Sequence, residues 1–79
     1  MVSLNVDAAG LYCPLPIVEL KLGLEKVEVG EIVELISDDP GIEKDLPQWC
    51  SSSGNKLLSI RRDKNTFTAY VKKSAPKSK

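Results

Sequence analysis

The chain has 79 residues, 11 of them basic and 11 acidic, and it contains two cysteines and no histidine. A chain of this length forms one small domain, and its balanced charge predicts no strong direct binding to nucleic acid. No apolar run approaches about 18 residues and no charged segment leads into an apolar one, so we expect neither membrane insertion nor secretion but a cytoplasmic protein.

The first predicted element is a short strand at the start of the chain. Val2, Leu4 and Val6 alternate with polar residues, a pattern typical of a strand with one buried face. Gly10 comes after this strand. A glycine there would allow a tight backbone approach from the strand, because it has no side chain.

A helix is predicted directly after Cys13. Pro14 fits the first turn of a helix, where an N–H would have no partner, and the apolar positions that follow recur at three- and four-residue steps to about Lys26. These apolar positions are Ile17, Leu20, Leu24 and Val27. Pro16 disfavours helical geometry in the residue before it, which leaves Leu15 or Pro16 itself as alternative first residues.

Cys13 is predicted at or near the N-cap of this helix. The partial positive charge of a helix N-terminus favours a thiolate, and it lowers a thiol pKa from its ordinary value of about 8.5. Pro14 and Pro16 remove two backbone donors from the first turn, so the helix dipole would stabilise the anion more than direct amide contacts would. From the residues alone, Cys13 is either a reactive thiol or a small buried hydrophobe.

The lack of histidine limits the chemistry of this thiol. Cys13 cannot form the Cys–His pair by which most cysteine hydrolases activate their nucleophile. Two distant cysteines also cannot supply the ligands of a zinc site. We therefore expect no metal and no cofactor.

The middle of the chain predicts a second strand and a second helix. Residues Glu31–Ser37 are rich in β-branched side chains, and Asp38–Gly41 has the composition of a turn. Because Pro47 cannot lie deep inside a helix, we expect a late start, with Asp45 as the N-cap and Gln48 completing a capping box.

Ile42 is expected to pack from an irregular turn before this second helix, and Gly54 to end the helix as a left-handed C-cap. The residues predicted on its buried face are Leu46, Trp49 and Cys50. Cys50 is either a resolving thiol for Cys13 or a core residue. Its position, roughly 7 Å along the helix axis, disfavours a disulfide, and its apolar neighbours favour the core.

The last two predicted strands are Lys56–Arg62 and Thr66–Lys72, which form a hairpin. Basic residues gather around it, namely Lys56, Arg61, Arg62 and Lys64. They could face an acidic partner or RNA, but a solvated edge that discourages aggregation explains them better. The acidic residues Asp39, Glu43 and Asp45 are explained as turn and cap residues.

The predicted element order is β-α-β-α-β-β, which indicates an α+β fold. A strand-helix-strand unit makes its strands parallel and the hairpin adds antiparallel pairs, so we expect a mixed four-stranded sheet with both helices on one face. The other face should be polar, lined by Thr66, Thr68, Tyr70 and Lys72. Residues 1–73 are expected to form this single domain, and residues 74–79 a frayed polar tail.

One combination of residues spreads over most of the chain: Asp7, Gly10-Leu11, Cys13-Pro14-Leu15-Pro16, Asp39-Pro40-Gly41, Asp45, Trp49-Cys50 and Gly54. Over residues 4–72 this combination resembles the TusA family, also called SirA, of small sulfur-carrier proteins. The resemblance implies a two-layer α/β sandwich. It also implies that Cys13 is the persulfide-bearing cysteine, within a motif to which Gly10, Pro14 and Pro16 contribute.

A member of this family would act as a sulfurtransferase in a sulfur relay. It would accept sulfane sulfur from a cysteine desulfurase or another persulfide donor protein and pass it to a downstream acceptor protein. In the best-known family role the relay ends in tRNA thiolation, and other members serve sulfur oxidation or molybdenum-cofactor metabolism. We expect a monomer that meets these protein partners in turn.

Asn55 departs from the family pattern, because many members have histidine at this position and asparagine does not titrate near neutral pH. Two other functions are open from the sequence. A non-enzymatic regulatory or adaptor module would bind a protein partner through the same surface. Direct RNA binding through Arg61 and Arg62 is the weakest alternative.

Overall fold

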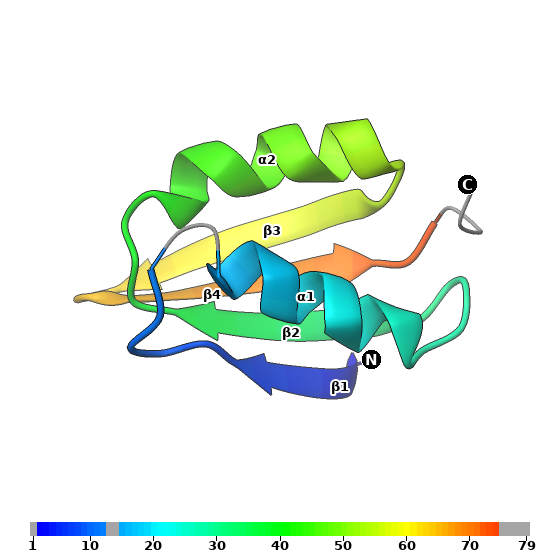
Figure 1. Ribbon diagram of the computed structural model, residues 1–79, viewed down its shortest axis with the longest axis horizontal. Coiled ribbons are helices and arrows are strands. Elements are labelled where there is room, and N and C mark those ends of the chain that lie inside the picture. Colours follow the sequence, from blue (N-terminus) through cyan, green and yellow to red (C-terminus); the bar gives the residue numbers. More distant parts are fainter. Residues whose placement is uncertain (1, 13–14, 75–79) are drawn as a thin grey trace.

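The computed structural model describes residues 2–12 and 15–74 (Figure 1). Both helices cover the same face of a four-stranded sheet, which gives the protein two layers. In chain order the elements are β1 (Val2–Asp7), α1 (Leu15–Glu25), β2 (Ile32–Ser37), α2 (Ile42–Ser53), β3 (Lys56–Asp63) and β4 (Thr66–Lys72). The predicted α+β fold and its β-α-β-α-β-β order are confirmed.

The sheet is mixed, with the strand order β1-β2-β4-β3. β1 and β2 are parallel, and β4 is antiparallel to both β2 and β3. Asp7 pairs with Ile36, and Ser37 pairs with Phe67, so β1 and β2 end at the edge of the sheet where β3 turns into β4 (Figure 1). We call this end of the molecule the carboxyl edge, and it comprises Ala8–Tyr12, Asp38–Gly41 and the Lys64–Asn65 turn.

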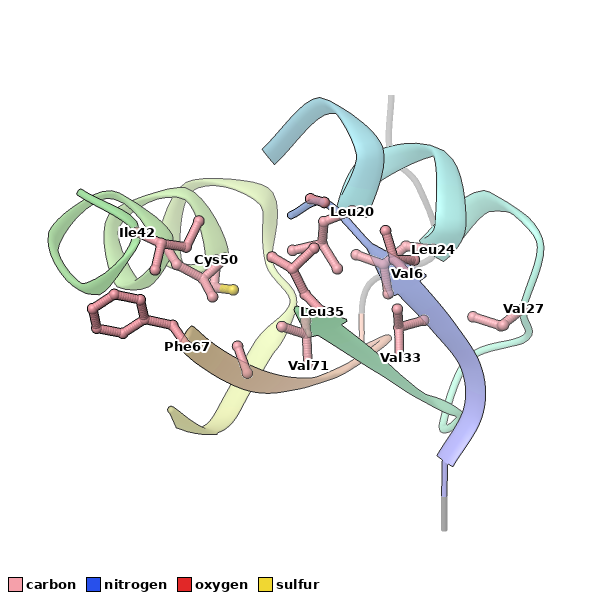
Figure 2. Packing of buried hydrophobic residues seen from close by; sticks show 13 residues of the cluster. Val6, Leu20, Leu24, Val27, Val33, Leu35, Ile42, Cys50, Phe67 and Val71 are labelled. Carbon is pink, nitrogen blue, oxygen red and sulfur yellow. The ribbon is translucent and has the colours of Figure 1, made fainter. Parts of the chain in front are cut away.

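The core fills the space between the sheet and the helices (Figure 2). In β4 the alternate residues Phe67, Ala69 and Val71 are buried, and they pack with Leu20 of α1 and Leu46 of α2. The residues between them in β4 lie on the opposite face of the sheet, as predicted, and no helix among residues 2–12 and 15–74 covers that face. The alternation therefore arises because only one face of the sheet is covered.

The predicted start of α2 is wrong. The helix begins at Ile42, with Gly41 and not Asp45 at its N-cap. The Ile42 side chain is only 3% exposed, and its burial stabilises this additional first turn. Pro47 consequently lies inside the helix, where it cannot donate to the Glu43 carbonyl. Both Pro47 and Glu43 are exposed, so water can replace the missing donor.

The predicted end of α2 is confirmed. Gly54 has a φ of 86° in the left-handed region, and its amide donates to the Cys50 carbonyl at 3.0 Å. The predicted hairpin is also present, with Lys64 at a φ of 58° in its turn. Of the predicted tail, Ser74 is described, and residues 75–79 lie outside the described residues.

Candidate functional site

The candidate site lies at the carboxyl edge, on the connection between β1 and α1. Cys13 and Pro14 lie outside the described residues, so their roles stay predictions. Tyr12 and Leu15 flank them in the chain, and these two side chains are 71% and 48% exposed. The connection therefore reaches the protein surface both before and after the predicted reactive thiol.

Backbone hydrogen bonds hold the segment that leads to Cys13. The Ala8 amide donates to the Ile36 carbonyl at 2.7 Å, and the Leu11 amide donates to the Ala8 carbonyl at 3.1 Å. Gly10 has a φ of +85°, and a Cβ placed on it would meet no heavy atom within 4 Å. Glycine is therefore required for its left-handed backbone and not for the tight approach that the sequence suggested.

Two carboxylates also accept hydrogen bonds from this segment. Asp7 Oδ1 accepts from the Ala9 amide at 3.0 Å. The two carboxylate oxygens of Asp38 lie 3.1 and 3.2 Å from the Gly10 nitrogen, which donates to them. Sequence reasoning treated Asp38 only as a turn residue. The sequence did contain a signal for this contact: Asp38 directly follows a strand predicted to be parallel to β1, and parallel strands end at the same edge of a sheet.

The first turn of α1 is anchored in the core. The helix begins at Leu15, one of the two alternative starts, and the Leu15 amide donates to the Tyr12 carbonyl at 2.8 Å. Pro16 is less than 2% exposed, so it fills the core in addition to its place in the first turn of the helix. Further along, Gly23 brings α1 close to β1, since a Cβ there would lie 2.7 Å from Val6 Cγ2. These contacts fix the direction of α1 relative to the sheet.

The exposed side of α1 carries apolar side chains beside the charged Glu19, Lys21 and Glu25, and sequence reasoning missed the apolar ones. Four exposed apolar side chains follow one another at three- and four-residue spacing and define what we call the apolar stripe: Tyr12, Leu15, Val18 and Leu22. The exposed residues of α2 are mostly polar, namely Glu43, Lys44, Pro47, Gln48, Ser51 and Ser52. The sequence did contain a signal for this stripe, because the α1 segment has apolar residues on two sides. A surface helix normally has only one apolar face.

Cys50 belongs to the core. Its side chain is 2% exposed and points in among the apolar residues between α2 and the sheet (Figure 2). Burial raises the pKa of this thiol from 9.0 to about 11, because the thiolate would lose its hydration. At neutral pH Cys50 is therefore protonated and a poor nucleophile.

Asn55 lies at the end of the sheet opposite to the carboxyl edge. It immediately precedes β3, whose first residue Lys56 pairs with Lys72, and Lys72 also pairs with Ile32 at the start of β2. The Asn55 amide group donates to Ser53 Oγ at 3.1 Å, and Asn55 Oδ1 accepts from the Ser74 amide at 3.2 Å. Asn55, the expected departure from the family pattern, is thus remote from the segment that leads to Cys13.

A cavity of about 220 Å³ lies beside Asn55, between the C-terminal ends of the two helices. Its lining includes Leu24, Glu25, Trp49 and Ser53. This cavity is also at the opposite end from the candidate site, so it does not contribute to the surroundings of Cys13.

The basic residues of the hairpin lie on an edge strand. β3 is the outer strand of the sheet next to β4, and Arg61, Arg62 and Lys64 are exposed. The Arg62 guanidinium lies over the Phe67 ring, 5.9 Å from its centroid. These positions agree with the predicted solvated edge.

Two further properties concern residues 2–12 and 15–74. No group of three or more His, Cys, Asp or Glu side chains within this part of the chain could hold a metal ion. In the same part of the chain, neither helix has the length and apolar character needed to cross a membrane.

Comparison with known proteins identifies the family. The family described as "Sulfurtransferase TusA" matches residues 5–73. A protein of Archaeoglobus fulgidus named "Putative sulfur carrier protein" is 41% identical over 68 residues, which cover 86% of this chain and 93% of that protein. The "Sulfur carrier protein TusA" of Allochromatium vinosum is 36% identical over 70 residues, which cover 89% and 92% of the two chains.

A solved structure confirms the fold. The SirA-like protein from Desulfitobacterium hafniense superposes with a TM-score of 0.77, covering 92% of this chain and 100% of that one, at 20% sequence identity. The match of the family over nearly all of the domain, together with relatives of this similarity, shows that the chain belongs to the TusA family.

Proposed function

We propose that this protein is a sulfur carrier that accepts sulfane sulfur as a persulfide on Cys13 and relays it to an acceptor. The observation that carries the proposal is the burial of Cys50, the other thiol of the chain. Cys50 is buried with a raised pKa, whereas the neighbours of Cys13 in the chain, Tyr12 and Leu15, are exposed. The names of the TusA relatives support a sulfur-carrier role for the same chain.

The proposed chemistry consists of two thiol exchanges that need no external oxidant. In the first, the Cys13 thiolate attacks the outer sulfur of a donor persulfide, the donor S–S bond breaks, and the donor cysteine leaves as a thiolate. Cys13 then carries the S–SH group. In the second, an acceptor thiolate attacks that outer sulfur, and Cys13 is released as a thiolate.

Neither exchange requires a general base if Cys13 is ionised. The chain contains no histidine that could serve as one. The N-terminus of α1, which begins two residues after Cys13 in the chain, supplies a partial positive charge that favours the thiolate. The proposed site therefore depends on the helix dipole and on exposure of the sulfur to its partners.

We propose that the donor is a protein with a persulfide, such as a cysteine desulfurase, and that it docks on the apolar stripe. Direct sulfur exchange requires the donor to cover the surface next to Cys13, where Tyr12 and Leu15 are exposed. The stripe continues from there along α1. The surface that four side chains offer is smaller than the roughly 800 Å² that each partner buries in a stable interface. A small contact suits a complex that must dissociate after transfer.

The proposal extends to a monomeric, cytoplasmic carrier whose sulfur reaches a downstream acceptor protein. Thiolated tRNA, sulfur oxidation and cofactor synthesis are the candidate destinations. Reconstitution with each acceptor system in turn distinguishes them, because sulfur should leave Cys13 only when the correct acceptor is present.

Loading with sulfur tests the proposal directly. The protein is incubated with a cysteine desulfurase and free cysteine under conditions that load a known carrier, and its intact mass is measured. We expect one added sulfur in the wild type and in Cys50→Ala, and none in Cys13→Ser. Absence of added sulfur from the wild type, or sulfur retained by Cys13→Ser, would contradict the proposal.

An adaptor function is the second candidate, favoured by the apolar stripe, because such a surface can bind a partner without any chemistry. The two candidates differ in their need for the thiol. Full complementation of a deletion strain by Cys13→Ser supports the adaptor, whereas loss of complementation supports sulfur transfer.

A further inference from the structure

We propose that Asp38 is a positioning residue for sulfur transfer: its carboxylate holds the segment before Cys13 in the orientation that a protein partner requires. This inference rests on the proposed function. It concerns a side chain that belongs to the loop after β2 and not to the motif around the thiol.

The contact that carries the inference joins two distant parts of the chain. The Gly10 amide lies 3.1 and 3.2 Å from the two oxygens of Asp38, which is 28 positions further along the sequence. The bond links the connection between β1 and α1 to the connection between β2 and α2 at the carboxyl edge.

Each partner in this bond is itself held in place. Gly10 has a left-handed φ of +85° within a segment that starts from the buried Ala8. Asp38 follows Ser37, which is 1% exposed and whose Oγ accepts from the Asp39 amide at 3.1 Å. The bond joins two exposed residues and ties the segment three residues before Cys13 to the buried, hydrogen-bonded end of β2.

Rigidity matters for a protein donor in a way that it does not for a small reagent. A donor approaches with a surface of fixed shape, so its persulfide meets the Cys13 thiolate productively only when the connection has one orientation, and misplacement by about 1 Å can reduce a rate by up to about a hundredfold. A small alkylating reagent can approach from any direction. Loss of the Asp38 bond should therefore slow transfer from the donor without slowing alkylation.

The experiment compares Asp38→Ala with Asp38→Asn. Alanine removes the acceptor, whereas asparagine keeps an oxygen that can accept from Gly10 and removes the charge. Glu31→Ala is the matched control, because Glu31 Oε1 accepts from the Glu28 amide at 2.8 Å in the connection before β2, away from the carboxyl edge. For each variant we measure the rate of sulfur loading from a cysteine desulfurase, the rate of Cys13 alkylation by iodoacetamide, and hydrogen exchange of the Gly10 amide.

We expect Asp38→Ala to slow loading by about tenfold, with Asp38→Asn and Glu31→Ala within about twofold of the wild type. Alkylation should not slow in any variant, and Gly10 exchange should accelerate in Asp38→Ala alone. Loading of Asp38→Ala at the wild-type rate overturns the inference, and so does an equal loss in Asp38→Asn, since that assigns the effect to charge. A wild type that takes up no sulfur refutes the proposed function instead. In that case hydrogen exchange still tests the contact, because unchanged exchange of the Gly10 amide in Asp38→Ala would show that the Asp38 bond does not hold this segment.

Discussion

At the scale of single residues, burial sets the chemistry of Cys50. Cys50 is enclosed in the core, and its pKa is raised to about 11, so its proton stays in place at neutral pH. Tyr12 and Leu15, which lie on either side of Cys13 and Pro14 in the chain, are exposed, and the segment before Cys13 is held by hydrogen bonds to Ile36 and Asp38. In the proposed carrier the buried Cys50 takes no part in transfer, which avoids scrambling of the sulfur between two sites.

The raised pKa of Cys50 predicts a dependence of stability on pH. Between pH 9.0 and about 11 the unfolded chain loses this proton while the folded protein keeps it, so the free energy of unfolding falls as pH rises through that range. Urea denaturation under reducing conditions should show a steeper fall for Cys13→Ser than for the double variant Cys13→Ser/Cys50→Ala. Equal slopes for the two proteins would show that Cys50 ionises as easily in the fold as in the unfolded chain.

Gly10 provides a second prediction at this scale. Gly10→Ala should lower the free energy of unfolding by about 1 kcal/mol, because φ is +85° while the space around the new Cβ is empty. Gly30→Ala is the matched control, since Gly30 has a φ of +96° and equal space but lies in the connection before β2.

Both glycine variants should lose similar stability in chemical denaturation, but only Gly10→Ala should also slow sulfur loading. Equal loading rates in these two variants would mean that the backbone before Cys13 does not influence transfer.

At the scale of elements, the two helices differ in what they present to solvent. α1 buries one side through Pro16 and Leu20 and exposes the apolar stripe on the other, whereas the exposed side of α2 is mostly polar. A stable two-layer fold does not require an apolar outer side on a helix. The role that we propose for the stripe is therefore binding, and the stripe runs from Tyr12 along the helix that follows the proposed reactive thiol.

The stripe predicts that charge on α1 blocks docking without unfolding the protein. Val18→Lys and Leu22→Lys alter side chains that are 43% and 46% exposed, so stability should change by no more than about 0.5 kcal/mol. Loading by a protein donor should fall by about tenfold, as for a central interface residue, while alkylation of Cys13 is unchanged. Ser51→Lys, on the exposed side of α2, is the control and should load normally. Normal loading of both α1 variants would exclude this side as the docking surface.

At the scale of the whole molecule, the features that sequence predicted are those set by local pattern. The alternation in β4 and the C-cap at Gly54 depend on neighbouring residues, and both are present. The start of α2 could not be found in this way. Pro47 argues locally for a late start, but burial of Ile42 against the rest of the fold outweighs that preference.

The candidate site likewise combines a feature that is visible in the local sequence with a contact that only the fold creates. Cys13 stands out in the sequence because of the prolines that follow it. The bond between Gly10 and Asp38 does not, because it joins residues 28 positions apart and exists only once β1 and β2 lie side by side. Long-range contacts of this kind become visible in the fold and not in the pattern.

The central claim is that sulfur travels on Cys13. The most direct measurement follows labelled sulfur from cysteine, through a desulfurase, to this protein, and maps the label by peptide mass spectrometry before and after an acceptor thiol is added. The label should appear on the peptide that contains Cys13, remain absent from the peptide that contains Cys50, and leave with the acceptor. Label on Cys50, or label on Cys13 that no acceptor thiol removes, would contradict the account.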